Sequence, residues 1–358
     1  MTCLGAVARD VVGSGPKKVL VVSDAGVMDA GHTLRGIELL NEAGFVTRLF
    51  CDFTENPNTD QVEAGRRVAG EFQPDLLVGL GGGSSLDCCK GINFLHTSGG
   101  RMQDYWGKGK ATAPMLPMIA VPTTAGTGSE AQSFALISDA QTRQKMACGD
   151  KKAACRAAIL DPELTITQPP QITALTGIDA ISHAVESYVS TAHNAASRVF
   201  SREAFAHLAA NFDNVLAESN NMVARGNMQW GACLAGMAIE NSMLGAAHAL
   251  ANPLTAQFDV PHGQAVGVAL PHVVQFNGED PDVSGDYERL AAIGVDELAD
   301  RIVRWLTAAG LKTRLADLGV DRRRFPQLAE EAAAQWTGTF NPRGLTPADF
   351  QRLYEQAW

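Results

Sequence analysis

Residues 76–87 have the sequence LLVGLGGGSSLD, in which an apolar run of strand length is followed directly by three glycines and two serines. A short continuous apolar run favours a strand buried on both faces of a parallel sheet. The next residues, Cys88 to Leu95, have the pattern of a helix. Glycines between a strand and a helix let backbone N–H groups approach a phosphate, and the helix N-terminus adds partial positive charge. The segment could therefore hold a pyrophosphate, although from the glycines alone a plain tight turn is the favoured explanation.

Similar apolar runs and helix-length segments alternate through the first half of the chain. The further strand candidates are Val19 to Val22, Val46 to Phe50 and Met118 to Val121, and the helix candidates between them include Leu34 to Ala43 and Gln61 to Phe72. This alternation predicts a doubly wound α/β domain with a parallel sheet.

The residue pattern changes after Asp161-Pro162 and the pair Pro169-Pro170. Beyond them, Ala-rich helical patterns replace the strand-like apolar runs. A chain of 358 residues exceeds the usual length of one compact core, so two domains are expected. We predict an α/β dinucleotide-binding domain over residues 1–162 and an all-helical metal-binding and substrate domain over residues 163–358. The predicted helices include Ala174 to Val189, Ser201 to Ala217, Gly231 to His248, Val295 to Ala309 and Pro347 to Trp358.

Composition excludes several classes of protein. A formal net charge of -10, with no basic run longer than Arg322-Arg323-Arg324, argues against nucleic-acid partners and anionic membranes. No apolar stretch is long enough to span a bilayer, and the charged pair Arg9-Asp10 interrupts any signal-peptide core, so a cytoplasmic enzyme is expected. The 7 cysteines lack CxxC spacing, and the adjacent Cys88 and Cys89 fit buried packing better than a reactive thiol role.

A second loop strengthens the nucleotide interpretation. Residues 122–130, PTTAGTGSE, follow the apolar strand candidate Met118 to Val121. Ligands of open α/β sheets bind where such loops gather at the carboxyl ends of strands, which makes a nucleotide site the better interpretation even though neither loop matches G-x-G-x-x-G. Asp24 ends the first strand candidate, where a carboxylate accepts from ribose hydroxyls and repels a 2′-phosphate. From position alone, a helix N-cap explains Asp24 equally well.

Candidate metal ligands lie in the second half. Asp179 and His183 have i, i+4 spacing within a helical pattern, which puts both on one helix face, although a surface Asp–His hydrogen bond is the commoner cause of such a pair. His248 lies among small and apolar residues, where an unpartnered imidazole is costly, and His262 lies in the turn-like Pro261-His262-Gly263. One carboxylate and three imidazoles suit Fe(II), Zn(II), Mn(II) or Co(II).

Other polar residues receive weaker assignments. Glu186, three residues beyond His183, could orient a ligand, but helix packing or a surface ion pair explains it at least as well. The remaining histidines are assigned no role: His32, His96, His193 and His207 show no partner at ligand spacing, and His272 could cap or pack near the site.

With these residues in view, the chain resembles the iron-containing, or group III, alcohol dehydrogenases, particularly members similar to lactaldehyde:propanediol oxidoreductase. The resemblance runs nearly end to end. It rests on the strand end at Asp24, Asn56-Pro57, Gly81 to Asp87, Pro122 to Thr127, Gly177 to Glu186, Pro261-His262-Gly263, and the terminal Leu353-Tyr354 to Ala357-Trp358.

The resemblance implies a fold, a reaction and a set of site residues. The fold is an N-terminal α/β domain and a C-terminal helical domain, usually in homodimers, and the reaction is hydride transfer between NAD and a small primary alcohol, diol or aldehyde. The implied metal ligands, which also act in catalysis, are Asp179, His183, His248 and His262. The implied cofactor-binding residues are Asp24, Asn56, Gly82, Gly83, Ser84, Asp87, Thr123, Thr124, Thr127 and Lys145.

The sequence departs from the family pattern in two places. Family members often carry a second histidine four residues after the position of His248, but here that residue is Asn252, and an amide cannot shuttle a proton near neutral pH. Proton release by water or a ribose hydroxyl is expected instead. The chain also lacks most of an amino-terminal segment that adds a strand in relatives, so either the natural start lies upstream or dimer packing differs.

Two alternative functions stay open at this point. A glycerol- or polyol-type dehydrogenase of the same superfamily would act on phosphorylated or polyhydroxy substrates, but no basic cluster accompanies the metal residues in the sequence. A non-redox metal-dependent enzyme would leave the two nucleotide loops unexplained.

Overall fold

The computed structural model describes residues 1–13, 15 and 17–358 of the chain. These form two compact units. The first unit contains residues 1–124 and 129–167, and the second contains residues 125–128 and 168–358. Residues 122–130 are called the threonine loop. Its short segment 125–128 belongs with the helical part of the chain. The sequence-based boundary between residues 162 and 163 stays a prediction.

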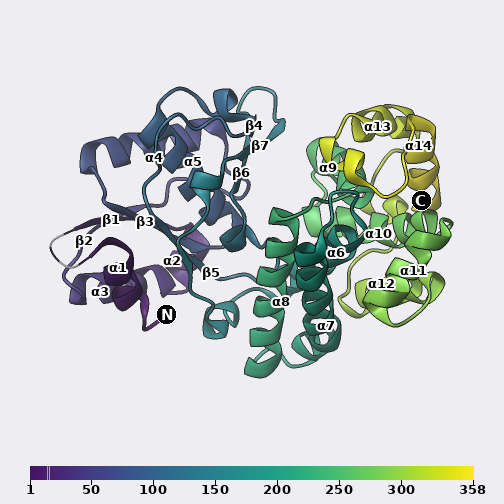
Figure 1. Ribbon diagram of the computed structural model, residues 1–358, viewed down its shortest axis with the longest axis horizontal. Helices are drawn as coiled ribbons and strands as arrows, with labels where there is room; N and C mark the ends of the chain where they lie inside the picture. Colours follow the sequence, from purple (N-terminus) through teal and green to yellow (C-terminus); the bar gives the residue numbers. More distant parts are fainter. Residues whose placement is uncertain (14, 16) are drawn as a thin grey trace. The chain divides into compact units, whose positions relative to one another are not determined.

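The first unit is built on a parallel sheet with the strand order β2-β1-β3-β5-β8 (Figure 1). All of its neighbouring strands pair in parallel, as the continuous apolar runs predict. The chain moves from β1 to β2 on one side and then crosses to β3 on the other side, so the order reverses between β1 and β3. The strands are β1 (Lys18–Val22), β2 (Val46–Phe50), β3 (Leu76–Gly81), β5 (Met118–Pro122) and β8 (Ala157–Ala158).

Helices cover both faces of this sheet. Successive strand residues, such as Val19 and Leu20, belong to two separate apolar clusters, because their side chains point to opposite faces of the sheet. One cluster includes Leu40 of the helix α3 and the other includes Leu86 of the helix α5, which confirms the doubly wound arrangement. The α-helices of this unit are α1 (Leu4–Val12), α2 (Ala25–Asp29), α3 (His32–Glu42), α4 (Thr59–Phe72) and α5 (Gly83–Ser98).

A small second sheet, with the order β4-β7-β6, extends the first unit. This sheet was not predicted: its strands β6 and β7 form an antiparallel hairpin in which buried residues alternate with more exposed ones, unlike the continuously buried strands of the parallel sheet. Its strands are β4 (Gly107–Lys108), β6 (Phe134–Ser138) and β7 (Lys145–Gly149). The 3-10 helices of the unit are η1 (Met102–Tyr105), η2 (Ser129–Ala131), η3 (Lys151–Ala153) and η4 (Pro162–Thr165).

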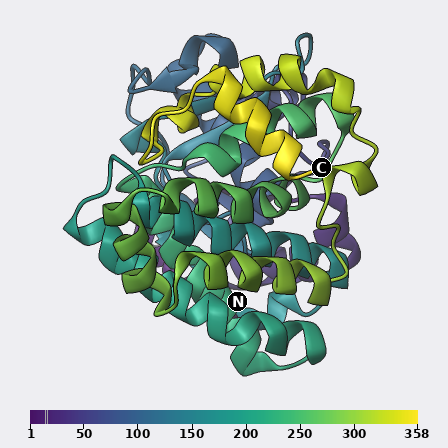
Figure 2. The same ribbon diagram turned by 90° about the vertical axis from the view of Figure 1, so that its right-hand side faces the viewer.

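The second unit is helical, as predicted (Figure 2). Its helices pack around one large apolar cluster. The predicted single helix Gly231 to His248 is wrong: the chain leaves the helical path between Asn241 and Gly245. The α-helices are α6 (Pro170–Val189), α7 (Ala195–Ala217), α8 (Met222–Glu240), α9 (Ala246–Phe258), α10 (His262–Gly278), α11 (Pro281–Ala291), α12 (Val295–Ala308), α13 (Phe325–Ala333) and α14 (Pro347–Gln356), with 3-10 helices η5 (Leu315–Leu318), η6 (Arg322–Arg324) and η7 (Trp336–Phe340).

Candidate metal centre and nucleotide loops

Helix α6 supplies two neighbouring polar side chains to the interior of the helical unit. The helix begins with Pro170 at its first position, where a proline costs no hydrogen bond, and is buried over most of its length. Asp179 and His183 lie one turn apart, and His183 Nε2 is 3.3 Å from Asp179 Oδ1. Both residues are buried, so the surface Asp–His pair that the sequence left open is wrong.

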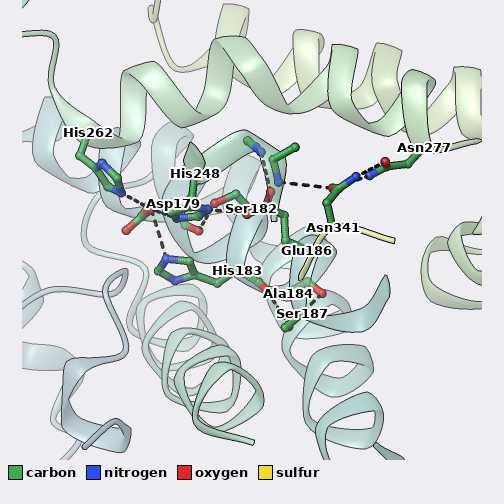
Figure 3. A network of polar contacts seen from close by, with 12 residues as sticks. Asp179, Ser182, His183, Ala184, Glu186, Ser187, His248, His262, Asn277 and Asn341 are labelled. Carbon is green, nitrogen blue, oxygen red and sulfur yellow. Dashed lines mark hydrogen bonds and ion pairs between the residues drawn. The ribbon is translucent and has the colours of Figure 1, made fainter. Parts of the chain in front are cut away.

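Two further histidines approach the same carboxylate oxygen from α9 and α10 (Figure 3). His248 Nε2 is 3.5 Å from Asp179 Oδ1, and His262 Nε2 is 3.8 Å from it. Ligand atoms of Asp179, His248 and His262 all lie within 4.8 Å of one another, a spacing that could hold a metal ion. His262 is the first residue of α10 rather than part of an isolated turn. Three separate helices therefore bring the predicted residues together.

The electrostatics of this cluster fit a bound cation. Asp179 Oδ1 and His248 Nε2 are buried, and neither has a hydrogen-bond partner among the described residues. Such orphaned buried atoms are costly unless something else binds them, and a divalent cation between the carboxylate and the imidazoles would satisfy both. Mixed oxygen and nitrogen donors of this kind suit Fe(II), Zn(II) and related ions.

The pKa values of the cluster shift in the directions that these contacts require. Burial disfavours the Asp179 carboxylate, but the neighbouring His183, His248 and His262 outweigh it and lower the pKa of that carboxyl well below its usual range. Burial lowers the pKa of His183. Burial also acts to lower the pKa of His248, but the carboxylates of Glu186 and Asp179 raise it to about 9. The carboxylate charge is thus maintained at the centre of the cluster.

Glu186 contacts the cluster from the next turn of α6. Its Oε2 lies 2.5 Å from His248 Nδ1, and its Oε1 accepts a hydrogen bond of 2.7 Å from the backbone N–H of Ala247. Glu186 is buried, so the surface ion pair is wrong, whereas the other two alternatives are both observed: Glu186 contacts a candidate ligand and also joins α6 to the start of α9.

The nucleotide loops lie at the carboxyl ends of neighbouring strands of the first unit. Asp24 follows β1 and Gly82 follows β3, so both flank the point where the strand order reverses, which is where open α/β sheets bind ligands. Gly81 has a φ of 152°, and Gly82 is the N-cap of α5. Asp24 Oδ1 caps α2 by accepting from Val27 N, whereas its Oδ2 accepts from Ser85 Oγ at 2.7 Å. Asp24 is therefore a helix N-cap, which is one of its two predicted roles. Its contact with the ribose of the cofactor stays a prediction.

A chain of polar contacts links several predicted cofactor residues. Ser84 Oγ accepts from the backbone N–H of Asn56 at 3.1 Å, and Lys145 Nζ donates to Asn56 Oδ1 at 3.1 Å. Asn56, which has a φ of 53°, is thus held against the start of α5 and also contacts β7. Asn56, the start of α5 and the start of β7 therefore meet beside Gly81 to Gly83, which are called the glycine loop.

Asp87 lies deeper on α5, and its burial is the main reason that its pKa is raised. Its Oδ1 accepts from Ser129 Oγ at 2.6 Å. Lys90, which the sequence analysis did not single out, is fully buried and donates to Ser129 O, Ser129 Oγ and Phe134 O at 2.6 to 2.9 Å. Lys90 thereby holds the end of the threonine loop and the start of β6.

The predicted threonines divide between the two units. Thr123 donates its backbone N–H to Gly81 O at 3.0 Å, and a Cβ added at Gly82 would lie 3.0 Å from Thr124 Cγ2, so both threonines lie against the glycine loop. Thr127 belongs to the segment 125–128 of the helical unit. Its assignment to the cofactor site stays a prediction.

Asn252 occupies the position one turn beyond His248 on α9. Its Nδ2 donates to Gln335 Oε1 at 3.0 Å, and the residue is half-buried. The amide is thus held by the protein and carries no proton that it could transfer.

A parallel α/β unit with glycine and threonine loops at its strand ends, together with a helical unit holding a buried Asp–His cluster, defines a metal-dependent dehydrogenase. Two family models match the chain in succession. Residues 2–162 match the model for iron-containing alcohol dehydrogenase, and residues 173–358 match the C-terminal model of the Fe-containing alcohol dehydrogenase family. The chain belongs to the iron-containing alcohol dehydrogenase family and is an oxidoreductase, so the non-redox alternative is wrong.

Individual relatives cover nearly the whole chain. Alcohol dehydrogenase 4 of Schizosaccharomyces pombe is 34% identical over 99% of this chain and 86% of its own length. The NAD-dependent methanol dehydrogenase of Bacillus methanolicus is 31% identical over 96% of this chain and 93% of its own length. Among solved structures, a 1,3-propanediol oxidoreductase is 33% identical with a TM-score of 0.93, covering 100% of this chain and 95% of the other. The described part of the chain contains no helix with the length and apolar character needed to span a membrane.

Proposed function

We propose that this chain is an NAD-dependent, Fe(II)-dependent dehydrogenase that acts on a small primary alcohol or diol and reduces the corresponding aldehyde. Asp179, His183, His248 and His262 are the proposed metal ligands. The observation that carries the proposal is the convergence of three imidazole Nε2 atoms on Asp179 Oδ1, at 3.3, 3.5 and 3.8 Å. The NAD dependence of the methanol dehydrogenase relative supports the choice of cofactor.

The proposed cofactor residues have distinct tasks. The backbone around Gly82 and Gly83 and the start of α5 bind the pyrophosphate, because a helix N-terminus attracts anions. The Asp24 carboxylate accepts from the ribose hydroxyls of the adenosine half. Further contacts around the dinucleotide are assigned to Asn56, Ser84, Asp87, Thr123, Thr124, Thr127 and Lys145.

The chemistry divides between bound groups and the chain. A divalent cation in the Asp–His cluster would polarise the substrate oxygen, and NAD would accept the hydride from the carbinol carbon. The alcohol thereby loses a hydride and a proton and becomes an aldehyde. Since the Asn252 amide cannot accept that proton, we assign its release to water or a ribose hydroxyl. The chain's own residues bind and orient both partners, which is their main contribution to the rate.

The experiment tests whether turnover depends on the bound metal ion. Metal-stripped protein is supplied with Fe(II), Zn(II), Mn(II) or Co(II), and NADH absorbance is followed with a panel of short aldehydes and diols. The proposal predicts no turnover without metal and restoration by at least one of these ions. Metal-independent turnover by the stripped protein would refute it. A homodimer is expected from the family resemblance, and sedimentation of the purified protein tests it.

A further inference from the structure

Two acceptor side chains from distant parts of the helical unit meet the first turn of α9. The backbone N–H of Ala246 donates to Asn341 Oδ1 at 3.3 Å, and the N–H of Ala247 donates to Glu186 Oε1 at 2.7 Å. A Cβ added at Gly245 would lie 3.0 Å from the Asn341 oxygen and 3.1 Å from the Glu186 oxygen. The first N–H groups of a helix have no partner within the helix, so these two side chains satisfy the start of α9.

Glu186 also contacts His248, which lies in that same first turn. Its second oxygen, Oε2, is 2.5 Å from His248 Nδ1 (Figure 3). An ionised carboxylate only accepts hydrogen bonds, so Nδ1 carries the proton that is shared with it. The other ring nitrogen, Nε2, is directed at the Asp179 carboxylate oxygen 3.5 Å away and has no hydrogen-bond partner among the described residues. One carboxylate therefore fixes both the backbone that carries His248 and the rotation of its ring.

Asn341 also caps the start of α9, but none of its hydrogen bonds within the described residues involves His248. Its Oδ1 also accepts from Asn277 Nδ2 at 3.1 Å, and its Nδ2 donates to Asn277 Oδ1 at 2.7 Å and to the backbone oxygen of Arg343 at 2.8 Å. The two side chains differ in their contact with His248, so they can be separated by experiment.

We propose that Glu186 is a positioning residue for the metal centre, holding His248 so that its Nε2 lone pair points at the cation, whereas Asn341 only stabilises the start of α9. This inference rests on the proposed function, because it takes His248 as a metal ligand. Outer partners of this type orient imidazole ligands and increase their basicity. Glu186 acts through His248 and touches neither the substrate nor the cation.

The test compares Glu186→Gln with Asn341→Ala in the full chain. Two quantities are measured: the dissociation constant for Zn(II), by competition with a chromophoric chelator, and the urea midpoint of the metal-free protein. Glu186→Gln keeps an oxygen that can cap Ala247 but removes the carboxylate facing Nδ1, so Zn(II) binding should weaken ~10–100-fold. Its urea midpoint should change little. Asn341→Ala should show the reverse, with a lowered urea midpoint and the Zn(II) affinity of the unaltered protein.

Glu186→Asp provides a second, more conservative variant. It keeps the charge but is one methylene shorter, so it cannot reach both Ala247 N and His248 Nδ1 as Glu186 does. We expect an affinity between those of the unaltered protein and Glu186→Gln. If Glu186→Gln does not fold, weaker Zn(II) binding by a folded Glu186→Asp supports the proposal, and unchanged binding overturns it.

The outcomes separate this inference from the proposed function. Unchanged Zn(II) affinity in folded Glu186→Gln would show that Glu186 merely caps a helix, and the inference would be overturned. If the unaltered protein bound no Zn(II), or if His262→Ala bound it equally well, the metal centre itself would be wrong.

Discussion

The metal centre of the helical unit and the strand-end loops of the α/β unit are built in opposite ways. In the metal centre, side chains from three helices converge, and two buried atoms, Asp179 Oδ1 and His248 Nε2, have no hydrogen-bond partner among the residues described. In the loops, polar side chains satisfy one another, as Ser85 does for Asp24. The first arrangement leaves buried atoms that an ion could bind, whereas in the second the Asp24 carboxylate already has a protein partner. This difference suits a metal that stays bound and a cofactor that exchanges in each turnover.

The largest effect is expected from Asp179→Asn, which removes the one carboxylate on which the three imidazoles converge. Cation affinity should fall by more than the ~10–100-fold typical of outer partners, and turnover should fall with it. Metal content after dialysis and the rate of NADH consumption measure the two effects. Retention of both metal and activity would show that the convergence on Asp179 has no function.

Metal removal should destabilise the unaltered protein. Adding the cation at a hundred times its dissociation constant raises the free energy of unfolding by about 2.7 kcal/mol, because only the folded chain has the site. Urea unfolding with and without metal measures the shift. Asp179→Asn is the matched control, and an equal shift in that variant would place the stabilising ion elsewhere.

Gly81→Ala should disturb the nucleotide loop. Its φ of 152° is unfavourable for alanine, and the added Cβ would lie 2.3 Å from Ser85 Oγ and 2.9 Å from Asp24 Oδ2. We expect a loss of about 1–3 kcal/mol in stability, measured by urea unfolding, together with a higher KM for NAD.

Gly31→Ala is the control for that substitution. Gly31 has a φ of 81°, but its Cβ would meet nothing within 4 Å. The control should lose stability from backbone strain alone and keep its KM for NAD. An equal change of KM in both variants would contradict the assignment of the glycine loop to the cofactor.

The smallest effect is expected from Asp24→Asn. Asparagine is also a good N-cap, so α2 should be retained, while loss of the negative charge removes the repulsion of a 2′-phosphate. The preference for NAD over NADP, measured as the ratio of kcat/KM values, should narrow by up to about tenfold, an interaction of roughly 1.4 kcal/mol. An unchanged ratio would leave Asp24 with its capping role only.

Local sequence patterns predict the parallel sheet and most helices, because strands buried on both faces are short continuous apolar runs and amphipathic helices have a period of 3.6 residues. The break between α8 and α9 was not predicted: Asn241 and Gly245 are residue types that commonly flank a helix end, but the mostly small and apolar residues on either side of this segment favour one continuous helix. The start of α9 depends instead on Glu186 and Asn341, which are far away in the sequence.

The candidate ligands could be found because two of them share one helix at i, i+4 spacing and the others lie in unusual local contexts. The contacts that support these candidate ligands could not be predicted from the sequence. The position of Glu186 left three alternatives open, and nothing local predicts that Lys90 bonds to Ser129 and Phe134. Such partnerships depend on tertiary packing.

The most direct test of the account is anomalous diffraction at the iron edge from crystals of Fe(II)-loaded protein. Iron bound at the proposed centre should give a single strong peak at roughly 2.0–2.2 Å from an Asp179 oxygen and from the Nε2 atoms of His183, His248 and His262. A peak elsewhere in the chain, or no bound iron in active protein, would contradict this prediction.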